Sequence, residues 1–157
     1  EGSRFVVAAA TRQGILGDER LGNFLGRMSS LGIAPRQIQI RKVRGSSVEE
    51  GRRLARSLTL RRGNPLGVFS CWGDLVALGI CQGLMARGYR PLKDFRLVGY
   101  DGLSEAIQAR PAITTIFQPL AGMGEQAGKL IQDSLRGHLS GPRHVVLQPR
   151  LIRGGTA

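Results

Sequence analysis

Short apolar runs alternate along the chain with longer segments in which apolar residues recur every three or four positions. The short runs are typical of buried β-strands, and the longer spacing indicates helices with a buried face. Strands are predicted at 5–10, 38–43, 67–71, 95–100 and 111–116, followed by an extended tail at 145–152. Helices are predicted at about 18–32, 46–58, 74–86, 104–109 and 119–137. This alternation favours an α/β fold with a mostly parallel sheet flanked by helices.

Two predicted helices carry local signals at their start. Ser46 and Ser47 precede a helix with a glutamate three residues further on, which is a capping pattern. Asp74 is interpreted as the N-cap of the helix at 74–86 rather than as a catalytic partner of Asp101. That helix has apolar residues on more than one face, so it is expected to be buried on two sides or to meet a partner chain.

Length and composition indicate one globular domain. The chain has 157 residues, of which 41% are hydrophobic and 22% charged, so it is long enough for a core and not typical of disorder. No apolar run approaches the roughly 20 residues that cross a bilayer, and no membrane association is expected. The chain begins at Glu1 without an initiator Met, which is consistent with a fragment of a longer protein.

The formal net charge of +12 leaves two interpretations open. Clustered arginines and lysines, densest at 41–44 and 52–62, could neutralise nucleic-acid phosphates. They lack interleaved aromatic residues for stacking bases, and the basic residues are spread from Arg4 to Arg153. We therefore favour a solvated basic surface over a nucleic-acid patch.

No motif for catalysis, cofactor binding or metal binding accompanies this fold. The chain has no glycine-rich dinucleotide or nucleotide loop and no nucleophile elbow. Its cysteines, Cys71 and Cys81, and its histidines, His138 and His144, have no metal-ligand spacing. Both cysteines are expected to be buried thiols in a reducing compartment. We expect no enzyme, no cofactor and no metal.

Polar residues follow the predicted strands where ligands bind to open α/β sheets. Arg20, Trp72, Asp101 and Gln118 could together bind a polyhydroxylated or acidic ligand, with Trp72 offering a flat apolar face. Each also has a structural interpretation: Arg20 as a surface residue, Trp72 as packing, Gln118 as a loop residue. Asp101, between two glycines, is also typical of a turn.

The order of motifs resembles the ligand-sensing core of bacterial transcription regulators of the lactose-repressor and galactose-repressor type. The matching segments are 20–24, 45–51, 68–79, 97–101, 103–112, 113–119 and 147–154. The resemblance implies a lobe similar to those of type I periplasmic sugar-binding proteins, with the effector in a cleft between two lobes. It implies that 1–116 and 145–157 belong to the carboxyl-terminal lobe, whereas 117–144 cross to an amino-terminal lobe absent from this chain. Operator DNA would bind a helix-turn-helix headpiece, also outside this chain.

The resemblance also implies roles for individual residues. Arg20 matches the effector-binding arginine, Asp101 matches the acid that accepts hydrogen bonds from ligand hydroxyls, and Gln118 lies at a crossover position that can face the cleft. Two positions depart from the family: Gly73 stands where many relatives carry an asparagine, and Ser46 where some carry an aromatic residue. Trp72 could supply the missing aromatic surface.

Oligomeric state and location follow from the same resemblance. The family pairs its lobes through the helix after Asp74 and the helix near Ala109, so Leu75, Leu78 and Ala109 are predicted at a homodimer interface. A cytoplasmic repressor is expected, and the alternative is a periplasmic sugar-binding protein of a transport system. The helix at 119–137, without its lobe, is expected to fold back, to swap onto a neighbouring chain or to stay mobile.

Overall fold

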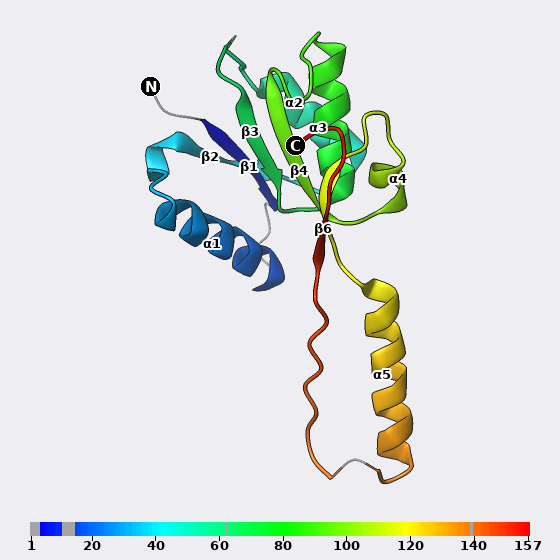
Figure 1. Ribbon diagram of the computed structural model, residues 1–157. Helices are drawn as coiled ribbons and strands as arrows, with labels where there is room; N and C mark the ends of the chain where they lie inside the picture. The colour runs from blue at the N-terminus through cyan, green and yellow to red at the C-terminus, as the bar shows by residue number, and fades with distance from the viewer. Residues whose placement is uncertain (1–3, 11–14, 62, 139) are drawn as a thin grey trace.

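The computed structural model describes residues 4–10, 15–61, 63–138 and 140–157, which form one six-stranded sheet (Figure 1). The strands lie in the order β2-β1-β3-β4-β5-β6. Their bounds are β1 Phe5–Ala10, β2 Ile38–Val43, β3 Leu66–Ser70, β4 Phe95–Asp101, β5 Thr114–Phe117 and β6 Arg150–Ile152. All neighbouring strands are parallel except β5 and β6, which are antiparallel. The predicted α/β class with a mostly parallel sheet is confirmed.

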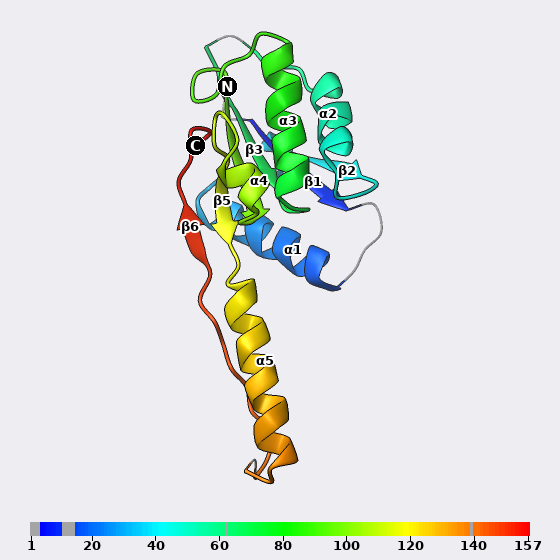
Figure 2. The same ribbon diagram turned by 90° about the vertical axis from the view of Figure 1, so that its right-hand side faces the viewer.

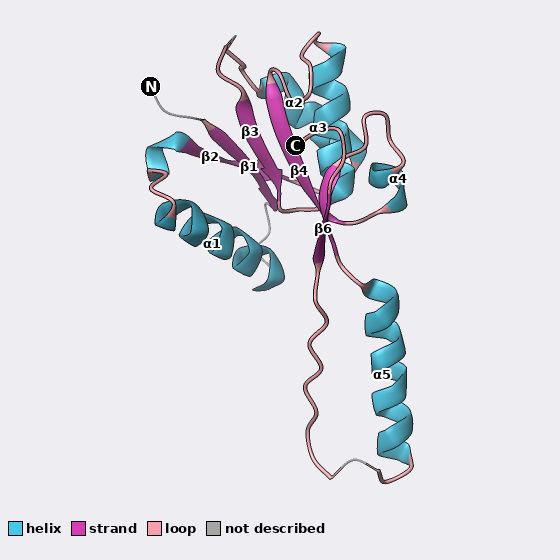
Figure 3. Ribbon diagram, in the orientation of Figure 1, coloured by secondary structure: helices cyan, strands magenta, loops and turns pink. Residues whose placement is uncertain are grey.

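Helices cover both faces of this sheet (Figures 1 and 3). The helices are α1 Ile15–Ser30, α2 Val48–Ser57, α3 Asp74–Ala86, α4 Ser104–Ile107 and α5 Leu120–Leu135, with a 3-10 turn at Pro35–Gln37. Successive residues of a strand point to opposite faces, and β1 shows this clearly. Val6 and Ala8 lie in the core cluster beneath α2 and α3, whereas Val7 lies in a second cluster against Phe24 of α1.

Helices α2 and α3 pack unusually closely because glycines face each other at their contact. A Cβ atom at Gly51 would overlap the carbonyl oxygen of Val76 and lie 2.8 Å from the Cα of Gly79. A Cβ atom at Gly79 would likewise overlap the carbonyl oxygen of Val48. The buried faces of α2 and α3 therefore account for part of the apolar excess that the sequence shows along 74–86.

Helix α5 and the segment after it form an arm that projects away from the sheet (Figures 1 and 2). No residue of α5 is buried, and Leu120, Ile131 and Leu135 are largely exposed. The returning segment runs beside the helix, where Leu147 approaches Gly122. Of the three outcomes expected for this helix, folding back onto the sheet is not observed, because α5 lies beside its own return segment. A swap onto a neighbouring chain and mobility stay predictions.

The chain returns from the arm into the sheet through β6 and a buried threonine. Thr156 is fully buried; its hydroxyl donates to the carbonyl oxygen of Leu97 and accepts from the backbone N–H of Thr114. The extended tail predicted at 145–152 is shorter as a strand, because only Arg150–Ile152 pair with β5. The two hydrogen bonds of Thr156 attach the end of the chain to β4 and β5.

One predicted cap is confirmed and one is wrong. Ser47 is the N-cap of α2, and its hydroxyl accepts from the backbone N–H of Glu50 at 3.2 Å. Asp74 is not the cap of α3; that position is Gly73, which has no side chain, and the Asp74 carboxylate bonds elsewhere. No helix in the described parts of the chain is long and apolar enough to cross a membrane.

Candidate ligand-binding site

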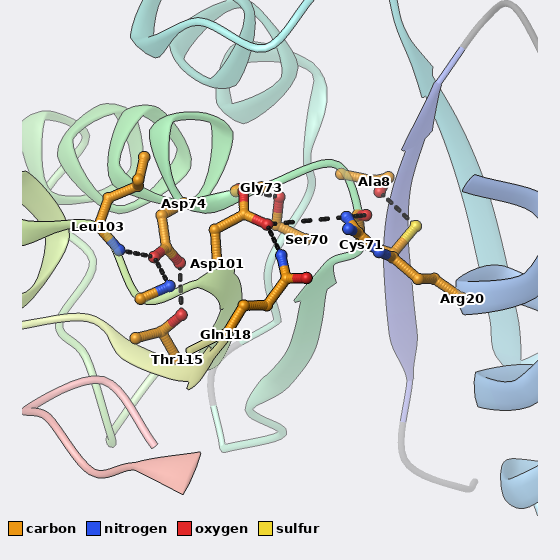
Figure 4. Close-up of polar contacts among 11 residues, drawn as sticks. Ala8, Arg20, Ser70, Cys71, Gly73, Asp74, Asp101, Leu103, Thr115 and Gln118 are labelled. Carbon is orange, nitrogen blue, oxygen red and sulfur yellow. Dashed lines mark hydrogen bonds and ion pairs between the residues drawn. The ribbon is translucent and has the colours of Figure 1, made fainter. Parts of the chain in front are cut away.

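Three of the predicted polar residues meet beyond the carboxyl end of β4, around Asp101 (Figure 4). The Oδ1 atom of Asp101 lies 3.8 Å from Nη1 of Arg20, and it accepts a hydrogen bond of 2.7 Å from Nε2 of Gln118. Arg20 comes from α1, Asp101 ends β4, and Gln118 follows β5. Residues far apart in the sequence therefore converge because parallel strands end at one edge of the sheet.

Arg20 is held in place by two further contacts. Its guanidinium lies over the ring of Tyr100 at 4.0 Å, and Nη1 donates to the carbonyl oxygen of Cys71 at 3.5 Å. The side chains of Arg20 and Asp101 remain 24% and 26% exposed, so solvent screens the pair and its contribution to stability is small. Both charged groups are consequently placed by their surroundings yet still reachable by a ligand.

The backbone at this site is strained. Asp101 has φ 115°, a region that side-chain-bearing residues rarely adopt, and Gly73 has φ 103°. A Cβ atom at Gly73 would lie 2.8 Å from Oδ2 of Asp101 and 3.4 Å from the hydroxyl oxygen of Ser46. Strain of this kind costs about 1 to 3 kcal/mol and is concentrated at functional sites. Gly73 therefore leaves the room that Asp101 needs.

A second carboxylate, Asp74, accepts hydrogen bonds from the turn that follows Asp101. Asp74 is fully buried, and its Oδ2 accepts from the backbone N–H groups of Gly102 and Leu103 at 2.7 and 2.8 Å. Its Oδ1 accepts from the Thr115 hydroxyl at 2.6 Å. One side chain of α3 thus joins the turn after Asp101 to β5.

Burial raises the pKa of both carboxyl groups. For Asp101, the neighbouring Arg20 and the hydrogen bond from Gln118 oppose this rise in pKa. For Asp74, burial raises the pKa most, hydrogen bonds from Thr115, Leu103 and Gly102 lower it, and the charge of Asp101 raises it again. Burial is thus the largest influence on the pKa of each group, and Asp101, the more exposed of the two, is the carboxylate that faces the Arg20 guanidinium.

The remaining predicted site residues differ in how closely they lie to the group of Arg20, Asp101 and Gln118. Gly73 borders Asp101, and the Ser46 hydroxyl lies near Gly73. Trp72 is half-buried and packs against the core beneath α2 and α3, so its role in stacking on a ligand stays a prediction. Leu75 and Leu78 on α3, and Ala109 after α4, are half-buried, and their place in a dimer interface also stays a prediction.

Two residues of the site were missed from the sequence. Tyr100 lies beneath Arg20, and Thr115 donates to Asp74. A signal for Tyr100 existed, since an aromatic residue at the end of a strand beside a candidate arginine suits a cation–π contact. Thr115 carried none, because a threonine in a strand is ordinary.

The described residues hold no group of three or more side chains suited to binding a metal ion, and both cysteines are buried and free. The site around Asp101 instead provides hydrogen-bonding groups. Arg20 and Gln118 provide donors, and Asp101 provides acceptors. Oδ2 of Asp101 accepts no hydrogen bond from any residue in the described part of the chain.

Polar groups at the carboxyl ends of parallel strands are the usual place for a ligand in open α/β folds, so the arrangement is typical of a binding domain. Residues 3–157 match the family described as periplasmic binding protein-like domain. The HTH-type transcriptional repressor PurR of Escherichia coli is 34% identical over 104 residues, which are 66% of this chain and 30% of PurR.

Solved structures of regulators have the same fold. A probable transcription regulator from Thermus thermophilus superposes with a TM-score of 0.82 and 28% identity, over 99% of this chain and 60% of that one. The transcriptional regulator CelR in complex with cellobiose gives a TM-score of 0.79 and 25% identity, over 98% of this chain and 46% of CelR.

The chain belongs to the periplasmic binding protein-like domain family, and the relatives that it matches are transcription regulators. It is accordingly a binding domain and not an enzyme. The chain spans about a third of the length of the curated relatives it matches, and about half that of the solved ones.

Proposed function

We propose that this chain is the ligand-sensing and dimerisation part of a cytoplasmic, DNA-binding repressor that responds to a small sugar-like metabolite. The observation that carries the proposal is the strained Asp101, whose Oδ1 lies beside the Arg20 guanidinium and whose Oδ2 accepts no hydrogen bond from any described residue. Vicinal hydroxyls can donate to that carboxylate and accept from the arginine at the same time. CelR, with cellobiose bound, supports a carbohydrate over other polar ligands.

The arm supports a second lobe in the complete protein. An exposed apolar helix on a projecting segment needs a partner surface, and the relatives are longer than this chain. In this proposal, residues 1–116 and 145–157 form one lobe, whereas 117–144 belong to the other, with the effector between them. Binding would shift the lobes towards a closed state and thereby change the affinity of a headpiece for operator DNA.

Dimerisation would use the outer face of α3. Leu75 and Leu78 are apolar and only half-buried there, and Ala109 lies near the α4 end of the same side. A Leu75→Arg variant of the complete protein should sediment as a monomer where the unmodified protein sediments as a dimer. An unchanged sedimentation coefficient at equal concentration would place the interface elsewhere.

A thermal-shift screen of the complete protein with sugars, sugar acids and nucleobases tests the ligand class, with cellobiose as the first probe. A ligand at 100 times its dissociation constant stabilises the folded state by about 2.7 kcal/mol.

Arg20→Gln should weaken the affinity for a ligand found in this screen about tenfold or more, because a charge-assisted hydrogen bond is lost. Arg27→Gln removes the same charge from an exposed position of α1 and should leave affinity unchanged. Equal losses in both variants, or a hit indifferent to Arg20, would contradict the proposed site.

A further inference from the structure

Strand β2 leaves one edge of the sheet open. It pairs with β1 on one side, and no strand lies on its other side among the described residues. The four residues from Gln39 to Lys42 are exposed, including Ile40 at 43%. An open edge presents backbone N–H and C=O groups to which another extended chain can bond.

The two faces beside this edge differ in chemistry. Val43 belongs to the core beneath α2, so Arg41, two residues earlier on the strand, faces the same side. Ile38 packs on the α1 side with Val7, and Ile40 therefore faces α1. A small pocket of about 180 Å³ on the α1 side is lined by Leu25, Ser29, Ile33, Pro35, Ile38 and Ile40. The α1 side of the edge is thus mainly apolar, although alternation places Lys42 on this side together with Ile38 and Ile40. A cavity on the α2 side also reaches Ile40 and Lys42 at the strand itself.

The α2 side is a basic groove. A cavity of about 610 Å³ there is lined by Ile40, Arg41, Lys42, Arg53, Leu54, Arg56 and Ser57. Neither Arg41 nor Lys42 forms an ion pair with any residue that the structure describes. The groove therefore carries excess positive charge beside the open backbone edge.

The acids nearest the groove do not neutralise it. Glu50 is engaged by Arg53 at 2.7 Å and by the backbone N–H of Arg44, and Glu49 by Arg56 at 2.8 Å. Those pairs leave the charges of β2 itself uncompensated. An incoming chain with acidic groups on this side would supply the missing charge.

We propose that the β2 edge binds an extended acidic segment of a partner protein as an added strand. The segment would alternate apolar residues, which face the α1 pocket, with aspartates or glutamates, which face the α2 groove. Side chains of an added strand alternate between the two faces of a sheet, and the two sides of this edge match such an alternation. The open backbone edge favours a polypeptide over a nucleic acid, because phosphates cannot continue a β-ladder.

Fluorescence anisotropy of this chain with a labelled short peptide of alternating valine and glutamate tests the proposal. Saturable binding is expected, weakened about tenfold by Arg41→Glu through loss of a charge pair and repulsion. Arg90→Glu makes the same change at an exposed site between α3 and β4, and should bind as the unmodified chain does. Circular dichroism would show that both variants remain folded.

Two altered peptides separate an added strand from simple charge attraction. A peptide with lysine in place of glutamate, and one with alternate backbone nitrogens methylated, should both lose binding. Equal binding of the methylated peptide would overturn the added strand. Tighter, Arg41-dependent binding of an oligothymidine would show a nucleic-acid surface instead, and no saturable binding of the acidic peptide would also overturn the proposal.

Discussion

At the scale of single residues, the site depends on two carboxylates with different tasks. Asp101 lies at the carboxyl end of β4 and keeps Oδ2 free, whereas Asp74 is fully buried and both of its oxygens accept hydrogen bonds from neighbouring groups. Asp74 therefore positions the turn that carries Asp101 and does not itself meet a ligand. The two roles can be separated by substitution.

Asp74→Ala should lower the free energy of unfolding by about 3 kcal/mol, because it leaves two backbone N–H groups and the buried Thr115 hydroxyl without their acceptor. Asp74→Asn is the matched control. Its amide oxygen can accept from both N–H groups while its NH₂ group donates to Thr115, so its loss should be much smaller. Urea unfolding measures both variants, and equal losses would contradict the positioning role.

The raised pKa of Asp101 has a consequence for stability against pH. The folded state binds the Asp101 proton more readily than the unfolded chain, where an aspartate titrates near 4. This group's contribution therefore falls as the pH rises from about 4 through the folded pKa. Measured by urea unfolding between about pH 4 and 7, the stability of the unmodified chain relative to Asp101→Asn should increase as the pH falls. An increase with rising pH would show that Arg20 outweighs burial.

At the scale of elements, α3 connects the core to the site. Its first residue, Asp74, bonds to the turn after β4, and its glycine contact fixes how closely it packs against α2. Arg20 depends in the same way on α1, which is attached through Phe24 stacked on Phe69 with ring centroids 4.8 Å apart. The positions of Asp101 and Arg20 therefore depend on how α3 and α1 pack against the rest of the chain.

Gly79→Ala should destabilise the chain by about 2 kcal/mol, because the added methyl group overlaps the backbone of α2 at Val48. Gly26→Ala supplies the control: it lies on α1 with no neighbouring atom within 4 Å of the added group. That change should be neutral or stabilise by up to about 1 kcal/mol, since alanine favours helix. Thermal and urea unfolding distinguish them; a neutral Gly79→Ala would mean that α2 and α3 are not locked at this contact.

The sequence predicts elements better than contacts between them. The range 74–86 was predicted for α3 and is observed, because its apolar spacing and flanking residues are local signals. The bonds of Asp74 to Gly102, Leu103 and Thr115 could not be predicted, since they depend on strand order and on how close α3 lies to β4. That Arg20 and Asp101 would converge was predicted from the strand ends and from the family resemblance, whereas the contact of Arg20 with Tyr100 came only from the structure.

At the scale of the whole molecule, the arm is an insertion between two paired strands. Phe117 and Arg150 lie opposite each other in the antiparallel pair of β5 and β6, and α5, which lies between them in the sequence, projects from the sheet (Figure 2). The sheet and its helices form their core without α5, none of whose residues is buried.

Replacing residues 118–149 by Asn-Gly should therefore leave a folded lobe, because that dipeptide suits a two-residue turn between antiparallel strands. The free energy of unfolding should change by no more than about 1 kcal/mol, in line with surface changes outside the core. Far-UV circular dichroism and urea unfolding beside the unmodified chain measure this. An unfolded product would show that the arm contributes to the lobe.

The same insertion has a consequence for synthesis on the ribosome. Thr156 and β6 complete the sheet beside β4 and β5, but they are translated only after the whole arm. Until then, β5 is paired with β4 on one side only, and Thr114 and Leu97 lack their bonds to Thr156. The nascent lobe therefore passes through a period in which its own final strand is missing and a β-strand of another molecule could pair in its place.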